Sequence, residues 1–343
     1  VVIASDFDQD GDLDLFISGR ALPDAYPLAP RSYLLQNNKG YFKDVTTSLS
    51  KELLQPGLIT DALWLDLDRD GYDDLILVGE WMPITIFKNE GGKHFSNQTR
   101  AYGLAQTAGW WNTLRAADLN GDGHPDLIAG NPGWNSLLRA TPAQPLTIHA
   151  ADFDNNGSIE GIICNYVQGQ SWPLPRKEVL DKILPLIKRR FIRFEDYAVA
   201  RIEEFFPKEQ LRKAHYLEAH TLASAVLLND GKGRFSMQPL PVLAQLAPVN
   251  GLLAEDFNGD GIVDILLVGN RYHCEVEIGR MDASNGLLLL GNGDGTFRAV
   301  WPRHSGFVAN RDARDLRMLR AANGHRLIVV TNNDGPVQVW QQN

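Results

Sequence analysis

Only two cysteines, Cys164 and Cys274, occur in the 343 residues, so a disulfide framework cannot hold this chain together. We expect both to be small buried apolar side chains. No apolar run approaches the roughly 20 residues that a membrane-spanning helix needs, and no signal peptide pattern begins the chain. Positive charge is also in deficit, with 33 Lys and Arg against 42 Asp and Glu. The resulting net charge of −9 argues against a surface for duplex nucleic acid, which must be basic.

What the chain does contain is one nine-residue acidic motif in five copies. Its form is Asp-x-Asp/Asn-x-Asp/Asn-Gly-x-x-Asp/Glu, and a short apolar run follows each copy. The copies are Asp6–Asp14, Asp66–Asp74, Asp118–Asp126, Asp152–Glu160 and Asp256–Asp264. Side-chain oxygens at positions 1, 3, 5 and 9 of a tight loop can converge on one point, and several hard anionic oxygens favour Ca²⁺. Glycine at position 6 permits the sharp turn that lets position 7 offer its backbone carbonyl.

The sequence excludes an EF-hand, which needs a bidentate Glu at position 12 and then a helix. Position 12 is Ile, Leu or Ala here and lies in a short apolar run such as LILV, which is typical of a buried strand. Each loop is therefore predicted to join two strands. A single copy is equally compatible with a metal-free turn, but five copies favour a cation, because crowded carboxylates repel one another.

The sequence thus predicts up to five calcium ions. Five ions would bring the net charge of −9 to about +1, so the excess of acidic residues is explained by the calcium that they would bind. The fourth loop is the weakest candidate, because Asn156 and Glu160 depart from the pattern. The predicted side-chain ligands are Asp6, Asp8, Asp10, Asp14, Asp66, Asp68, Asp70, Asp74, Asp118, Asn120, Asp122, Asp126, Asp152, Asp154, Asn156, Glu160, Asp256, Asn258, Asp260 and Asp264. The predicted carbonyl ligands at position 7 are those of Asp12, Tyr72, His124, Ser158 and Ile262.

A longer repeat surrounds each loop and predicts an all-β fold. An apolar strand precedes the loop, a buried strand follows it, and a third strand ends in a glycine-bearing hairpin before an aromatic residue. Four-stranded units recurring in this way indicate a β-propeller formed by residues 1–343 as one domain, with six visible blades and seven possible. The predicted blades are 1–56, 57–109, 110–145, 146–246, 247–308 and 309–343, and the last has lost its acidic loop.

The fourth of these blades is interrupted by a predicted helical insertion over residues 173–219, where apolar residues recur at helical spacing. Its basic run, residues 188–193, is interpreted as the solvated face of an amphipathic helix rather than a patch for nucleic acid or anionic glycan. As a cap over one mouth of the propeller, the insertion would shape a ligand pocket.

The loops DFDQDGDLD and DFNGDGIVD, with the GxF hairpins after them, resemble the FG-GAP and VCBS repeats of integrin-α-type propellers. The chain is similar most of all to bacterial secreted proteins of the cartilage-acidic-protein-like family. The resemblance covers the whole chain apart from the helical insertion. It implies calcium in the blades, seven blades, and a role outside the cytoplasm in adhesion or glycan binding.

Aromatic and polar residues between the strands form the predicted ligand site, because indole faces beside acids, amides and arginines suit a sugar chain. The candidates are Trp81, Trp110, Trp111, Asn112, Trp134, Arg271, Tyr272, His273, Glu275, Arg280 and Asp282. For each tryptophan taken alone, packing between blades is the simpler interpretation.

The predicted function is therefore a calcium-stabilised module that binds a carbohydrate or protein ligand. It would act at an extracellular, periplasmic or cell-surface location, where calcium is millimolar. The alternative is a polysaccharide lyase or glycoside hydrolase using residues 271–282, with Tyr272 or His273 as base, or with Glu275 paired with Asp282. The sequence contains no other catalytic motif, and we predict no catalytic residue.

Overall fold

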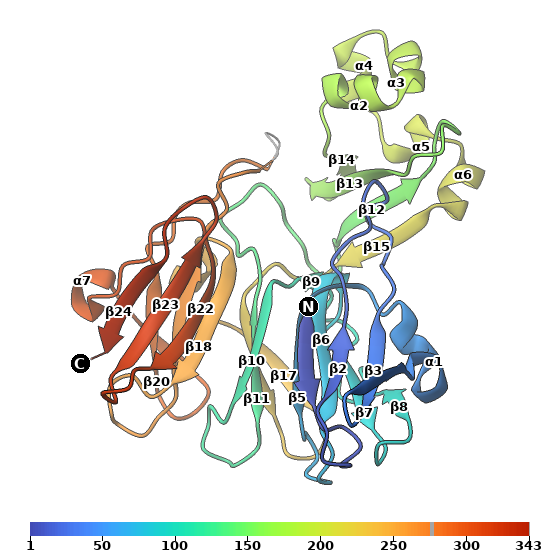
Figure 1. The fold of residues 1–343 in the computed structure, drawn as a ribbon. Coiled ribbons are helices and arrows are strands. Elements are labelled where there is room, and N and C mark those ends of the chain that lie inside the picture. Colours follow the sequence, from blue (N-terminus) through green and yellow to red (C-terminus); the bar gives the residue numbers. More distant parts are fainter. Residues whose placement is uncertain (275–277, 343) are drawn as a thin grey trace.

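The computed structural model describes residues 1–274 and 278–342, which form six antiparallel sheets and a few short helices (Figure 1). Five of the sheets are successive blades of a propeller-like fold. The first blade consists of β1 (Val2–Ser5), β2 (Asp14–Ile17), β3 (Tyr33–Asn38) and β4 (Tyr41–Asp44). The second consists of β5 (Leu58–Leu65), β6 (Asp74–Met82), β7 (Thr85–Asn89) and β8 (Phe95–Asn97), and β9 (Gly109–Trp110) also pairs with β6.

The third blade is assembled from two distant parts of the chain. Its strands are β10 (Thr113–Ala117), β11 (Asp126–Gly130), β16 (Ala225–Asn229) and β17 (Phe235–Pro239). The fourth blade contains β18 (Val249–Glu255), β19 (Asp264–Gly269), β20 (Leu287–Gly291) and β21 (Phe297–Val300). The fifth contains three strands, β22 (Ala313–Arg320), β23 (Arg326–Asn332) and β24 (Gln338–Gln342). Short helices α1 (Thr46–Leu49) and α7 (Pro302–Ser305) follow the first and fourth blades.

The first strand of every blade lies next to the first strand of the following blade. β1 contacts β5, β5 contacts β10, β10 contacts β18, and β18 contacts β22. The strand after the acidic loop is buried along its whole length in blades two to four, since it is covered by the neighbouring blades on both faces. Each acidic loop joins two paired strands, as the sequence predicts.

The predicted division of residues 110–246 into two blades is wrong. Leu127 pairs with Leu227, so strands that follow a long insertion complete the third blade. The insertion contains its own sheet, β12 (Leu146–Ala151), β13 (Glu160–Val167), β14 (Gln170–Pro173) and β15 (His215–Ala219), in the order β14-β13-β12-β15. Its first strand lies inside the sheet, whereas the first strand of each blade lies at an edge. This sheet stands away from the five blades in Figure 1.

The predicted helices of residues 173–219 are present within the insertion. They are α2 (Lys177–Ile183), α3 (Pro185–Arg190), α4 (Phe194–Ala198), α5 (Ile202–Phe205) and α6 (Lys208–Lys213). Their apolar side chains share one core with Phe153, Ile162 and Cys164 of the inserted sheet. None of the helices in the described part of the chain combines the length and the apolar character that a bilayer crossing requires. Cys164 is buried and free, as predicted, whereas Cys274 is free and only half-buried.

A second core joins the insertion to the blades. Leu146, Ile148 and Ala219 of the inserted sheet pack with Trp81 and Trp110 of the second blade. Strand β15 also contacts β6 and β9. The insertion is therefore held against the edge of the second blade, and the space between them forms the cleft described below.

Candidate functional site

The five acidic loops share one hydrogen-bonding scheme, which begins with the Asp at position 1. In the first loop, the two carboxylate oxygens of Asp6 accept the amides of Asp10 and Gly11, both at 3.0 Å. The backbone N–H at position 7 donates a hydrogen bond to the side-chain oxygen at position 5; in the first loop, the N–H of Asp12 donates to Oδ1 of Asp10 at 3.0 Å. The same bonds recur in the second, fourth and fifth loops. The third loop differs at one bond, because Asp118 accepts the amide of Gly121 at position 4 instead of the amide at position 5. Each loop is thus a preorganised turn.

The acid at position 9 begins the second strand and is the most buried member of each loop. Asp14 accepts the amides of Phe7 at 3.2 Å and Asn37 at 2.7 Å, which ties the loop to β3. Burial and, to a smaller extent, the charges of Asp8 and Asp10 together raise the pKa of Asp14 to about 6. For the same reasons, the pKa of Asp74 is raised to about 7. Burial and neighbouring carboxylates also raise the pKa of Asp126, Glu160 and Asp264.

Three loops bring carboxylate oxygens within 4.8 Å of one another, which fits a hard cation. These groups are Asp6, Asp8 and Asp14; Asp66, Asp68 and Asp70; and Asp152, Asp154 and Glu160. In the described residues, no basic side chain pairs with the carboxylates of the first or fourth loop. The fourth loop lies in the inserted sheet, and its acids converge although the sequence marks it as the weakest candidate.

The second loop already holds a positive charge. The ammonium of Lys88, on β7, forms an ion pair with Asp68 and a second at 3.3 Å with Asp70. The strand register places Gln36, Leu228 and Leu290 at the equivalent position of the other blades. Lys88 is therefore specific to the second loop, where it neutralises the charge that a cation would otherwise neutralise. The pKa of Lys88 is raised by its hydrogen bond to Asp68.

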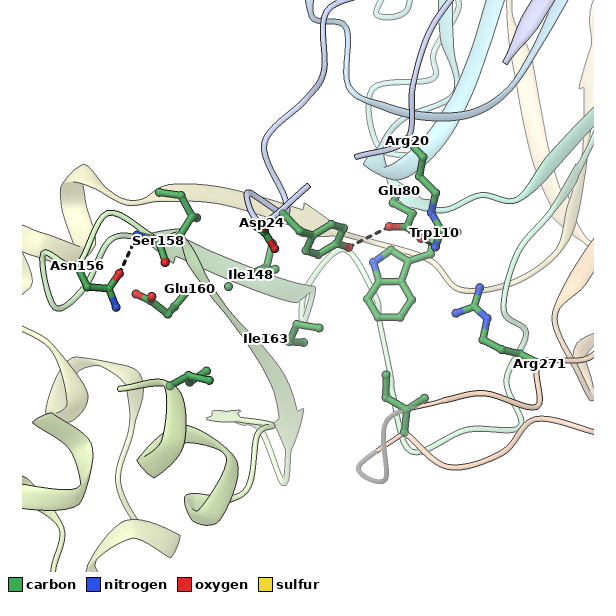
Figure 2. A pocket seen from close by; sticks show the side chains of 15 residues that line it. Arg20, Asp24, Glu80, Trp110, Ile148, Asn156, Ser158, Glu160, Ile163 and Arg271 are labelled. Atoms are coloured by element: carbon green, nitrogen blue, oxygen red, sulfur yellow. Dashed lines mark hydrogen bonds and ion pairs between the residues drawn. The ribbon is translucent and has the colours of Figure 1, made fainter. Parts of the chain in front are cut away.

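A cleft of about 960 Å³ lies between the blades and the insertion (Figure 2). The blades contribute Arg20, Tyr26, Glu80, Trp110 and Arg271, and the insertion contributes Ile148, Ile163 and residues of the fourth acidic loop. Asn156 and Glu160 lie at one end in Figure 2, Trp110 and Arg271 lie at the other, and Asp24 lies between them. The cleft therefore combines apolar walls with a few charged groups, which is the usual composition of a small-molecule site.

A connected polar network forms the wall beside Trp110. The hydroxyl of Tyr26 donates to Glu80 at 3.0 Å and accepts the indole N–H of Trp81, while Arg20 forms an ion pair with Glu80. Burial and the charge of Glu80 raise the pKa of Tyr26 above its ordinary value, so it remains a hydrogen-bond donor. Trp81 has a φ of 60°, which is costly for a bulky side chain and is found where the surroundings fix a functional position.

The two tryptophans Trp81 and Trp110 pack edge to face with ring centroids 4.9 Å apart, but only Trp110 lines the cleft. Trp111 is completely buried in the core of the second and third blades and donates to the carbonyl of Thr107 at 2.9 Å. The ligand role predicted for Trp111 therefore has no surface to act through. Trp134 is 47% exposed and lines none of the pockets named here.

Of the candidates predicted in residues 271–282, only some line the cleft. Arg271 lines the cleft and also a smaller pocket of about 240 Å³, which it shares with Asn112. Tyr272 donates to the carbonyl of Asn310, and its ring lies 3.9 Å beneath Arg280. Arg280 pairs with the exposed Asp282 at 2.8 Å, and His273 is exposed. Glu275 lies outside the described residues.

The residues of the cleft that sequence reasoning missed include Arg20, Tyr26 and Glu80. Arg20 and Tyr26 lie in the connection between β2 and β3, which is much longer than a tight hairpin. A long ordered connection in a repeat of short hairpins is a signal for function that the sequence does carry.

Comparison with known proteins is consistent with this architecture of four-stranded blades carrying acidic loops. A model of the FG-GAP-like repeat matches residues 6–77 and again residues 66–129. Residues 6–129 are thus similar to FG-GAP-like repeats, which confirms the resemblance of these loops to that type of repeat. The comparison with curated proteins gives no significant match.

Among solved structures, one match is an Agrocybe aegerita lectin that recognises non-reducing terminal N-acetylglucosamine. Identity is 17% over 100% of this chain and 80% of the lectin, with a TM-score of 0.33. Another is the V. cholerae biofilm matrix protein Bap1, with 10% identity, 99% and 68% coverage and a TM-score of 0.35. A third is BBS1N in complex with ARL6DN, with 10% identity, 100% and 91% coverage and a TM-score of 0.32. Scores this low imply nothing about the ligand of this chain.

Proposed function

We propose that this protein is an extracellular binding module whose acidic loops hold calcium and whose cleft binds a carbohydrate. The raised pKa values of the position 9 carboxylates support the calcium part, because they mark buried negative charge without a counter-ion. The first, third, fourth and fifth loops would hold calcium through the side chains at positions 1, 3, 5 and 9. Loops of this type fill where calcium is millimolar, which favours a location outside the cytoplasm.

The observation that carries the carbohydrate part is the cleft itself. Trp110 is 7% exposed and lines the cleft at one end, and charged groups and amides follow along the walls, including Arg20, Asp24 and Asn156. Sugars bind through stacking on aromatic faces combined with directional hydrogen bonds, so this lining suits a short saccharide. A volume of about 960 Å³ accommodates several sugar units rather than a single small metabolite.

A saccharide array probed with the calcium-loaded protein, followed by titration of each hit, tests this proposal. Trp110→Ala is expected to lower affinity by roughly tenfold or more, because it removes the stacking surface. Trp134→Ala is the matched control, since it removes an exposed tryptophan that lies outside the cleft. Because Trp110 also packs in a core, Ile163→Trp provides a second variant that fills the cleft without opening a cavity. Array binding that none of the cleft variants weakens would refute the site, and release of reducing ends would indicate an enzyme instead.

A further inference from the structure

We propose that the ligand of the cleft is an acidic saccharide and that Arg271 binds its carboxylate. This inference rests on the proposed function and specifies the ligand class of the same site. It depends on Arg271, whose guanidinium has no partner among the described residues, whereas Arg20 and Arg314 are paired.

Arg271 is mostly enclosed, yet its guanidinium makes no hydrogen bond or ion pair with any residue that the structure describes. Burial lowers the pKa of Arg271, and the charges of Arg20 and Arg314 lower it further, while Glu80 has the opposite effect. An enclosed guanidinium has five donors that need acceptors, and leaving them unmet costs free energy. A binding site for an anion explains this arrangement, because the anion supplies the missing acceptors.

Among the described residues, the two arginines nearest in charge effect to Arg271 already have carboxylate partners. Arg20 is paired with Glu80, and Arg314 is paired with Asp312 at 3.0 Å, so these two arginines are neutralised within the protein. Arg20, Arg271 and Arg314 all line the smaller pocket, together with the polar side chains of Thr60 and Asn250. Guanidinium groups bind carboxylates bidentately, so an acidic sugar matches this pocket better than a neutral one.

The two pockets share Arg20 and Arg271, so a ligand can occupy both. Figure 2 shows the Arg271 side chain reaching toward Trp110, which places the charge beside the stacking surface. The carboxylate of Glu160 lies at the far end of the cleft from Arg271, and that of Asp24 lies between Glu160 and Trp110. A saccharide with its ring at Trp110 and its carboxylate at Arg271 therefore keeps its charge away from these acids.

The test compares oligogalacturonate and oligoalginate with their carboxyl-reduced counterparts, using calorimetry on the calcium-loaded protein. The acidic forms are expected to bind and the reduced forms to bind at least tenfold more weakly. Arg271→Gln should lower affinity for the acidic forms by roughly 10- to 100-fold, which is typical for the loss of hydrogen bonds to a charged group. Arg280→Gln is the matched control, because Arg280 lies in the same segment, is 57% exposed and is paired with Asp282.

Each other outcome counts against a defined claim. Equal binding of acidic and reduced forms, or unchanged affinity in Arg271→Gln, overturns the acidic ligand and leaves carbohydrate binding standing. Binding of neutral saccharides alone also overturns the acidic ligand and leaves carbohydrate binding standing. If no saccharide binds the wild-type protein, the proposed function and this inference both fail. Should Arg271→Gln not fold, the salt dependence of wild-type binding decides, since affinity that is constant from low to high salt contradicts an ionic contact.

Discussion

Replacing Asp8 by Asn is expected to have opposite effects on stability with and without calcium. Asp8 and Asp14 have carboxylate oxygens within 4.8 Å of each other in the first loop. Two negative charges at that separation repel by about 1 kcal/mol in water and about 3 kcal/mol at the effective dielectric constant of a protein surface. Position 3 is already asparagine in the third and fifth loops, at Asn120 and Asn258, so an amide fits the turn.

Without calcium at pH 8, Asp8→Asn should therefore raise the free energy of unfolding by about 1–3 kcal/mol. With millimolar calcium, the same change removes an anionic ligand. A 10- to 100-fold weaker site then loses about 1.4–2.8 kcal/mol of ligand-derived stability. Urea unfolding followed by circular dichroism, in excess chelator and in excess calcium, measures both values. An effect of the same sign in both conditions would refute a calcium site in this loop.

The pH dependence of the chelated protein provides a further check. The folded pKa of Asp14, about 6, lies above its ordinary value of 3.8, so this group stabilises the fold fully below pH 4 and ceases to do so as the pH rises through 6. Chelated protein should thus be more stable at pH 5 than at pH 8, and Asp8→Asn should flatten the difference. Glu52→Gln, which alters an exposed carboxylate outside the loops, should leave the profile unchanged.

Two further predictions concern the second loop and the core. Lys88→Gln, which reproduces Gln36 of the first blade, should raise the calcium content by one ion per chain, because it removes the ammonium that pairs with Asp68 and Asp70. Elemental analysis of dialysed protein measures the calcium content, and equal content in the variant and the wild-type protein would contradict the prediction. Trp111→Ala should lower the free energy of unfolding by about 3–5 kcal/mol, because it leaves a cavity in a filled core, whereas Trp134→Ala should lie within about 0.5 kcal/mol of wild type in the same urea experiment.

The acidic loops and the strands around them were predictable because their signals are local. Spacing within nine residues determines which side chains share a turn, and the apolar runs that follow must be buried strands. The division of residues 110–246 was not predictable in this way. The hairpin at Asn229–Phe235 reads the same whether it completes the preceding sheet or an earlier one, and only the pairing of Leu127 with Leu227 decides.

The cleft was even less accessible from the sequence. Trp110 and Trp111 are adjacent and chemically identical, but successive residues of an extended chain point in opposite directions, so one lines the cleft and the other fills the core. Lys88 lies 18 residues after the last ligand side chain it pairs with, Asp70, and reaches the loop through the register of β6 and β7.

The sequence alone therefore determined the repeat, the all-β class and the crowded acidic turns, since each depends on spacing within a few residues. The tertiary structure alone decided which strands complete the third blade, which tryptophan lines the cleft, and which arginine has no carboxylate partner among the described residues. These are relations between residues up to about 250 positions apart, such as Arg20 and Arg271, and only the packing of the blades against one another brings these two arginines together.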